Sequence, residues 1–327
     1  MEWKLLTAGR LTRNKFWGES DLLAYRPVVA TSTLIRDGNT NILVDPSLPI
    51  GQMDALLRRR AGLSAEDIGL VYITHYHADH RVDALAYPHA ACCISEGTLN
   101  DMRAAIAGGD PQAPDRPEAY QVVRGQLTNR IALVPLPGHT AGLTGLSFTS
   151  GGQQRVLVTG DAVMDQDFFR HAEGYWFDKA PLTSAETIRQ AAGSADIVIP
   201  GHGDWFYAAD CSPFGQTAPS WDCRRLFSGD MAQCAWLLRQ EDCRLIVDPF
   251  VPASGMIRAL FDHSGLYPVE IDAVVFAKET PALPPISALF SKARVYCVGD
   301  ILPEGLTEEA LAALLKRRDD PAFTRSA

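Results

Sequence analysis

Four apolar segments of the sequence each lead into a histidine or an aspartate, and this pattern constrains the fold more than any other feature. The first covers residues 70–73 and opens into a dense polar stretch, Thr74-His75-Tyr76-His77-Ala78-Asp79-His80. The other three segments precede His139, Asp161 and His202, each of which follows a small or turn-forming residue. Strand ends that share one edge bring such side chains into a common cleft. The pattern therefore predicts a shared polar cleft, and the alternation of short apolar runs with helical patterns along the chain indicates an α/β or α+β layered fold.

The residue types at these strand ends are those that bind divalent metal ions. Imidazole and carboxylate groups together suit zinc and other first-row ions. In an extended segment, residues two apart share a face, so His75 and His77 can converge on one ion. If the chain then turns, Asp79 and His80 can face a second ion. A solvated polar loop is the alternative interpretation of this stretch.

The complete set resembles the metallo-β-lactamase-fold hydrolase superfamily, whose motif is His-x-His-x-Asp-His followed by His, Asp and His. The match covers roughly residues 30–205 and implies a four-layer αββα sandwich with metals at one edge of two sheets. The resemblance implies that one metal is held by His75, His77 and His139. It implies that the other is held by Asp79, His80 and His202, with Asp161 bridging the two and Asp45 supporting the metal loops.

The resemblance also implies a function. Asp161 indicates the glyoxalase II, lactonase and phosphodiesterase-like branches, because β-lactamases of this fold usually lack that bridging aspartate. We expect a dinuclear hydrolase with Asp79 and Asp161 as catalytic residues and a metal-bridging hydroxide that attacks an ester, thioester or lactone. Zinc is the expected metal, with iron or manganese as alternatives. A mononuclear-iron thiol or persulfide dioxygenase, a phosphodiesterase and a non-catalytic sensor are the competing functions.

An aromatic segment lies between two of the ligand positions. It contains four candidate substrate-binding residues: Phe168, Phe169, Tyr175 and Trp176. These side chains can line a substrate pocket or can pack against the helix expected near residues 184–192, and the sequence leaves both interpretations open. Residues 10–26, which include further aromatic residues, are a candidate lid over the cleft.

Composition excludes several classes of partner. The net charge of −9 and the lack of a basic cluster near the motifs argue against nucleic-acid binding, so we expect a small-molecule substrate. No apolar run approaches the ~18–20 residues of a membrane span, and no secretory signal begins the sequence. The seven cysteines include no C-x-x-C pair, which favours reduced thiols and a cytoplasmic location.

The sequence also contains an internal similarity. Leu43-Val44-Asp45-Pro46 and Ile246-Val247-Asp248-Pro249 lie 203 residues apart, and the same shift aligns residues 31–94 with 234–297 without a gap. We expect a hydrolase domain over residues 1–210, a connector over 211–233 and a C-terminal α/β unit over 234–327. This unit is either a partial repeat without metal ligands or a second unit of similar pattern. Its apolar strands need a covering surface, which is either the hydrolase domain or a second chain, and we favour a homodimer built partly through this unit.

Overall fold

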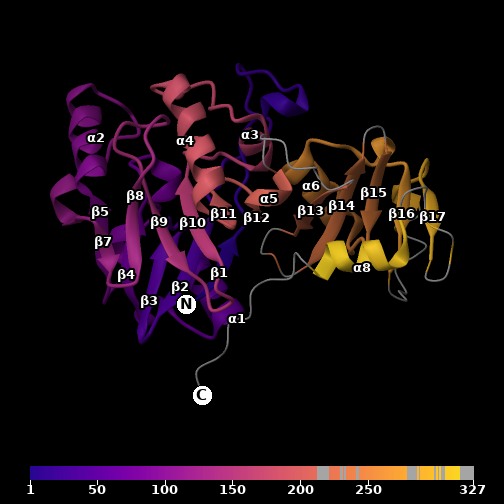
Figure 1. Cartoon of the computed structure of the whole chain (residues 1–327), viewed down its shortest axis with the longest axis horizontal. Helices are drawn as coiled ribbons and strands as arrows, with labels where there is room; N and C mark the ends of the chain where they lie inside the picture. The colour runs from indigo at the N-terminus through magenta and orange to yellow at the C-terminus, as the bar shows by residue number, and fades with distance from the viewer. Residues whose placement is uncertain are drawn as a thin grey trace. The chain divides into compact units, whose positions relative to one another are not determined.

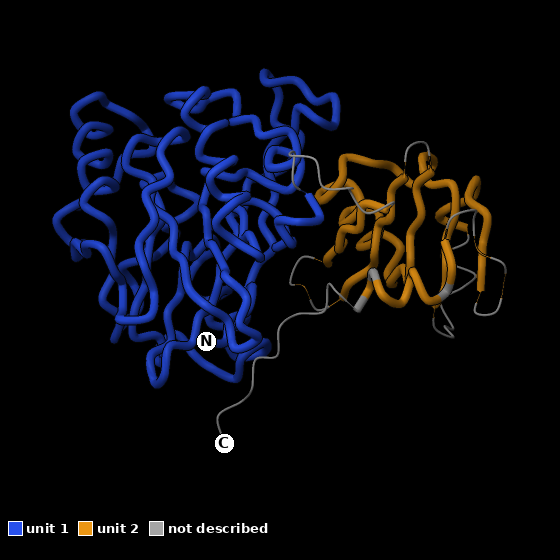
Figure 2. The backbone as a smooth tube through the Cα atoms, viewed as in Figure 1, with its two compact units in different colours: residues 1–216, 321–327 blue, residues 217–320 orange. Residues whose placement is uncertain are grey.

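The computed structural model divides the chain into two compact units (Figure 2). The first contains residues 1–216 and 321–327, and the second contains residues 217–320. The structure describes residues 1–211, 221–228, 231, 233–240, 243–277, 286, 288–297, 300, 302 and 306–316. In this part of the chain, the helices are too short or too polar to cross a bilayer.

The first unit contains two six-stranded sheets (Figure 1). The first sheet has the order β1-β2-β3-β4-β5-β6. Its strands are β1 (Glu2–Thr7), β2 (Ser32–Asp37), β3 (Thr40–Val44), β4 (Ile68–Ile73), β5 (Ala91–Ser95) and β6 (Gln121–Val123). The second sheet has the order β12-β11-β10-β9-β8-β7. Its strands are β7 (Gln126–Thr128), β8 (Ile131–Pro135), β9 (Thr144–Thr149), β10 (Arg155–Gly160), β11 (Ile197–Pro200) and β12 (Phe206–Tyr207).

Helices cover the outer faces of both sheets. On the first sheet, α1 (Ile50–Ala61) and α2 (Glu96–Ala107) bury Met53 and Met102 in one apolar core. On the second sheet, α4 (Pro181–Ser194) buries Ile188 in another core, which also includes residues of α3 (Gln166–His171) and α5 (Ala208–Cys211). The inner faces meet where the Tyr72 hydroxyl of β4 donates to the Thr144 carbonyl of β9, at 3.0 Å. The predicted αββα sandwich is confirmed.

The second unit contains one five-stranded sheet of order β13-β14-β15-β16-β17. Its strands are β13 (Asp222–Phe227), β14 (Cys234–Gln240), β15 (Cys243–Val247), β16 (Ala273–Val275) and β17 (Arg294–Tyr296), and its helices include α6 (Ala253–Ser264) and α8 (Glu308–Lys316). Strand β13 lies inside the segment that the sequence analysis expects to be a connector. Its two arginines and one aspartate hide the strand pattern, although it pairs with β14 as β1 pairs with β2.

The second unit repeats the path of the first half of the first unit. Both sheets have two antiparallel pairings followed by two parallel ones along β1–β5 and β13–β17. The registers also agree after the 203-residue shift, since Thr33 pairs with Val44 and Trp236 pairs with Val247. Asp45 and Asp248 have left-handed φ values of 50° and 49° after equivalent strands. The internal similarity in the sequence thus corresponds to one shared backbone path.

The sheet of the second unit is covered on both faces by residues of the same unit. Helix α6 buries Met256 and Leu260 against one face, and Leu306 and Leu311 of the α8 region pack on the other face. The homodimer was expected because these apolar strands need a covering surface. The unit supplies that surface itself, so the strands give no support to a dimer, and the oligomeric state stays a prediction.

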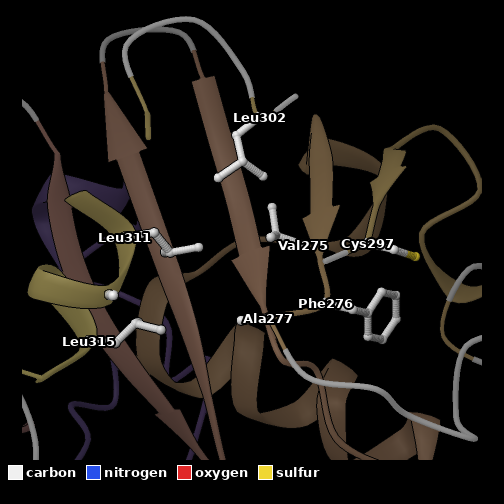
Figure 3. Close-up of a pocket in the computed structure, with 8 residues that line it drawn as sticks. Val275, Phe276, Ala277, Cys297, Leu302, Leu311 and Leu315 are labelled. Atoms are coloured by element: carbon white, nitrogen blue, oxygen red, sulfur yellow. The ribbon is translucent and has the colours of Figure 1, made fainter. Parts of the chain in front are cut away.

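Between α8 and the end of β16 lies a cavity of about 260 Å³ that is lined by apolar side chains, among them Val275, Phe276 and Leu311 (Figure 3). After the 203-residue shift, Val275 and Phe276 correspond to Tyr72 and Ile73 at the end of β4, two residues before His75. The residues that would replace the metal ligands, within 278–283, lie outside the described part of the chain, so the absence of metal ligands there stays a prediction.

Candidate metal centre

The seven predicted ligands lie at the ends of four strands in the first unit. His75 follows β4 by two residues, and His77, Asp79 and His80 lie in the short turn that comes next. The loop after β8 holds His139, and Asp161 directly follows β10. The loop after β11 holds His202, where Gly201 allows a close approach. A Cβ atom on Gly201 would lie 2.0 Å from Asp161 Oδ1, so no larger residue fits there without displacing the carboxylate.

The structure brings these side chains together in two groups. The first group consists of His75, His77, His139 and Asp161, and the second group consists of Asp79, His80 and His202. Within each group, one potential ligand atom per residue lies within 4.8 Å of all the others. Both candidate groups found among the described residues are in the first unit.

In the first group, three imidazole nitrogens and one carboxylate oxygen converge. His77 Nδ1 lies 3.0 Å from His75 Nε2 and 2.9 Å from His139 Nε2. Asp161 Oδ2 lies 3.3 Å from His139 Nε2 and 3.7 Å from His75 Nε2. Four ligands at zinc–nitrogen distances of 2.0–2.1 Å in a tetrahedron are about 3.3 Å apart. The spacing therefore fits an ion of this size at the centre of the group.

The second group has similar spacing and shares the Asp161 carboxylate. His80 Nε2 lies 3.8 Å from Asp79 Oδ2, and His202 Nε2 lies 3.6 Å from the same oxygen. Asp161 Oδ1 lies 2.9 Å from His80 Nε2 and 3.2 Å from His202 Nε2. One carboxylate thus directs an oxygen at each group.

Two atoms at the centre of this arrangement support a bound cation. His80 Nε2 and Asp161 Oδ1 are buried and lie 2.9 Å apart, but their contact lacks hydrogen-bond geometry, and neither atom makes a hydrogen bond in the described part of the chain. A buried polar atom without a partner is strongly unfavourable, and coordination to an ion satisfies it. The residues present therefore fit a divalent metal.

Other residues orient four of the five imidazoles through their second ring nitrogen. His80 Nδ1 lies 2.9 Å from Asp45 Oδ2, and His139 Nδ1 lies 2.8 Å from Asp178 Oδ1. His202 Nδ1 contacts the Val29 carbonyl oxygen at 2.9 Å, and His75 Nδ1 contacts the Thr74 hydroxyl at 3.2 Å. These contacts leave each Nε2 directed at a metal group, as is usual for metal-binding histidines.

Burial and charge give the two groups different protonation. Burial lowers the pKa of His77 to about 3 and the pKa of His75 well below its usual value, so both rings are neutral and ready to bind a cation. Burial alone would lower the pKa of His80 and of His202, but the nearby carboxylates, Asp161 first and then Asp79, together outweigh it and raise both. In the metal-free protein, these carboxylates thus favour protonated imidazoles in the second group.

The structure separates the four candidate substrate-binding residues into two pairs. Phe168 and Phe169 have no exposed surface, and Phe169 packs against Phe206 at a centroid distance of 4.9 Å. These two side chains pack in the core, which is the second of the two interpretations that the sequence left open. Their full burial argues against a place in the pocket wall. Tyr175 and Trp176 are half-buried, and their substrate role stays a prediction.

The candidate lid, residues 10–26, contacts α3 and the turn after it. The Trp17 indole donates to Asp167 Oδ2 at 2.9 Å, and the Asn14 amide donates to Asp165 Oδ2 at 2.8 Å. Phe16 stacks on His171 at a centroid distance of 4.2 Å. This docking leaves little freedom in the core of the segment, and its lid role stays a prediction.

Sequence reasoning did not predict Asp178 as a partner of His139. It follows no strand and belongs to no ligand motif. The only signal in the sequence is an acidic residue at the end of the aromatic segment Tyr175-Trp176-Phe177.

Comparison with known proteins identifies the family. The model of the metallo-beta-lactamase superfamily matches residues 25–202, which is more than half of the chain. The chain belongs to this superfamily. Together with the His/Asp cluster, this membership supports a metal-dependent hydrolase that uses divalent metal ions. A comparison with curated proteins found no match.

Several solved structures resemble the chain at low sequence identity. A probable metal-dependent hydrolase from Staphylococcus aureus is 14% identical, with a TM-score of 0.50 over 62% of this chain and 88% of that one. AidC, a dizinc quorum-quenching lactonase, is 18% identical, with a TM-score of 0.45 over 55% of this chain and 79% of that one. A quorum-quenching N-acyl homoserine lactone lactonase is 16% identical, with a TM-score of 0.47 over 62% of this chain and 91% of that one. These likenesses concern the fold alone.

Proposed function

We propose that this protein is a dinuclear hydrolase that cleaves an ester, thioester or lactone of a small molecule, with two zinc ions as its cofactors. The observation that carries the proposal is the position of Asp161. Its two oxygens face different groups, with Oδ1 near His80 and His202 and Oδ2 near His75 and His139. A carboxylate in this position can bridge two cations.

Two divalent ions held by these groups would supply Lewis-acid activation of a water molecule and of the substrate's carbonyl oxygen. The residues of the chain fix where that chemistry takes place. His75 and His80 have fully buried side chains, whereas the Asp79 side chain is 18% exposed. Asp79 therefore lies on the solvent side of the second group, and its Oδ2 faces the histidines. We assign its Oδ1 as the atom that accepts a proton from the attacking water.

The surroundings of the first group suit a substrate with an apolar portion. The turn that carries Tyr175 and Trp176 ends at Asp178, which contacts His139. Phe177 in the same turn is 59% exposed, and the Arg13 guanidinium lies 5.8 Å from its ring centroid. An exposed aromatic turn next to a metal ligand is a suitable wall for a small apolar group.

The proposal is tested by metal analysis followed by a substrate screen. We expect protein purified after growth with added zinc to contain two metal ions per chain. This protein should hydrolyse members of a panel of lactones, thioesters and aryl esters, and Asp161→Asn should abolish that hydrolysis. A preparation that binds two metals but cleaves only phosphodiesters would contradict the substrate class. Oxygen uptake with a thiol or persulfide, with one iron per chain, would contradict the hydrolase itself.

A further inference from the structure

We propose that Asp178 is a positioning residue that holds His139 in place for its metal and also fixes the aromatic turn beside it. The inference rests on the proposed function only in assuming that the first group binds a metal. It concerns a residue outside the seven ligands and outside their sequence motif.

The two oxygens of Asp178 have different partners. Oδ1 lies 2.8 Å from His139 Nδ1, and Oδ2 accepts a hydrogen bond from the Tyr175 backbone N–H at 3.1 Å. The side chain of Asp178 is 2% exposed, so water competes little for either contact. A carboxylate that accepts a hydrogen bond from Nδ1–H fixes the ring orientation and leaves the Nε2 lone pair free for a metal.

Backbone contacts join the same two segments. The Lys179 N–H donates to the His139 carbonyl at 3.2 Å, and the Ala180 N–H donates to the Gly138 carbonyl at 2.9 Å. Together with the Asp178 side chain, these bonds hold the turn and the His139 loop as one piece. A displacement of the turn therefore displaces the ligand.

The space around the carboxylate is also fixed. A Cβ atom on Gly174 would lie 2.2 Å from Asp178 Oδ2, which is far inside van der Waals contact. The absence of a side chain at Gly174 therefore provides the space that the Asp178 carboxylate occupies. Its carbonyl accepts a hydrogen bond from Lys15 Nζ at 2.7 Å, which connects this turn to the N-terminal segment.

The geometry makes Asp178→Asn an informative substitution. Both partners of the carboxylate are N–H donors, and an asparagine has one acceptor oxygen and one donor amide. If its oxygen faces His139, its NH₂ group faces the Tyr175 N–H, and the reverse orientation places that group against the His139 ring. An isosteric amide therefore keeps at most one of the two contacts.

The test measures zinc affinity by competition with a chromogenic chelator, together with metal content, in full-length protein. We expect Asp178→Asn to weaken one of the two zinc ions by about 10- to 100-fold, the usual effect of removing an outer partner of a ligand. Gly174→Ala should weaken the same ion, because it displaces the carboxylate without removing it. Asp45→Asn is the comparison at the second group, since Asp45 contacts His80 directly; it should weaken the other ion more than the first, which Asp45 reaches only through the Thr74 hydroxyl beside His75.

Two further measurements separate positioning from general damage. If Asp178 acts through His139, Asp178→Asn should have no additional effect on zinc affinity in a His139→Ala background, but should still weaken zinc in a His202→Ala background. Asp178→Ala removes both contacts, so hydrogen exchange of the peptide that contains the Tyr175 amide should become faster in that variant with zinc still bound at saturating concentration.

The outcomes for the two proposals are distinct. If wild-type protein binds no zinc, the proposed function fails. If wild-type protein binds two zinc ions and both Asp178→Asn and Gly174→Ala bind them equally tightly, the positioning role is wrong. An additional loss of similar size in the His139→Ala background would likewise overturn it, because a purely structural residue would behave in that way.

Discussion

Removing Asp161 should weaken both metal ions at once, unlike the removal of any other ligand. Asp161→Ala deletes an oxygen that lies 2.9 Å from His80 Nε2 and another that lies 3.3 Å from His139 Nε2. It also removes the carboxylate that raises the pKa of His80 and His202. His139→Ala, in contrast, removes a ligand of the first group alone.

The expected magnitude follows from the number of ligands. Structural zinc sites contribute roughly 10–16 kcal/mol, which is about 2.5–4 kcal/mol for each of four ligands. Since Asp161 serves both groups, its removal should weaken each ion by about 60-fold or more.

The assay is a zinc titration against chelators of graded affinity, with metal content measured after dialysis. We expect two tight ions in wild-type protein, one tight ion in His139→Ala and none in Asp161→Ala. Circular dichroism of the metal-free proteins controls for folding. Two tight ions in Asp161→Ala would refute the shared role of this carboxylate.

Three other predictions follow from particular contacts. Asp45→Ala should reduce the free energy of unfolding by roughly 3 kcal/mol more than Asp248→Ala, as measured by urea unfolding of the two variants. The reason is that Asp45 contacts the Thr74 backbone, the Thr74 hydroxyl and His80, whereas the contact found for Asp248 within the described residues is to one backbone N–H. Phe168→Ala should reduce the free energy of unfolding by about 3–5 kcal/mol, because Phe168 is fully buried. Trp176→Ala, at a half-buried position, should cost much less stability and should raise KM. Equal losses of stability in the two variants would contradict the assignment of Phe168 to the core and Trp176 to the pocket. Zinc that binds the second group displaces protons from His80 and His202, whose pKa values are raised, so zinc affinity should fall as the pH falls. Calorimetry in buffers of different ionisation enthalpy should detect the released protons. Zinc binding without proton release would contradict this protonation.

The ligands were predictable from the sequence because each belongs to a local pattern. His75, His77, Asp79 and His80 lie within six residues after one strand, and His139, Asp161 and His202 each follow a strand by a short turn. Strand ends at one edge of two facing sheets must lie near one another, so local patterns were enough to predict their convergence.

The residues that orient these ligands were harder to predict. Asp178 reaches His139 across 39 positions of sequence, and the Val29 carbonyl reaches His202 across 173. Such contacts depend on how loops fold back on the strands. Phe168 and Phe169 show the same limit, since burial rather than residue type separates a core aromatic from one that lines a pocket.

The second unit keeps the backbone path of the first unit but not all of its side-chain contacts. Asp248 keeps the left-handed φ of Asp45, and one of its oxygens accepts from the Ala277 N–H at 2.8 Å, as Asp45 accepts from the Thr74 N–H at 2.8 Å. Ala277 has no hydroxyl, so the second contact made by Thr74 is lost. The strand–turn geometry therefore persists where the polar side chains around it have been replaced.

Anomalous diffraction from crystals of zinc-loaded protein tests the central claim most directly. Data collected on both sides of the zinc absorption edge locate the ions without assumptions about the ligands. We predict two peaks in each chain, one among His75, His77 and His139 and one among Asp79, His80 and His202, with the Asp161 carboxylate between them. A single peak, or peaks away from these side chains, would contradict the dinuclear centre.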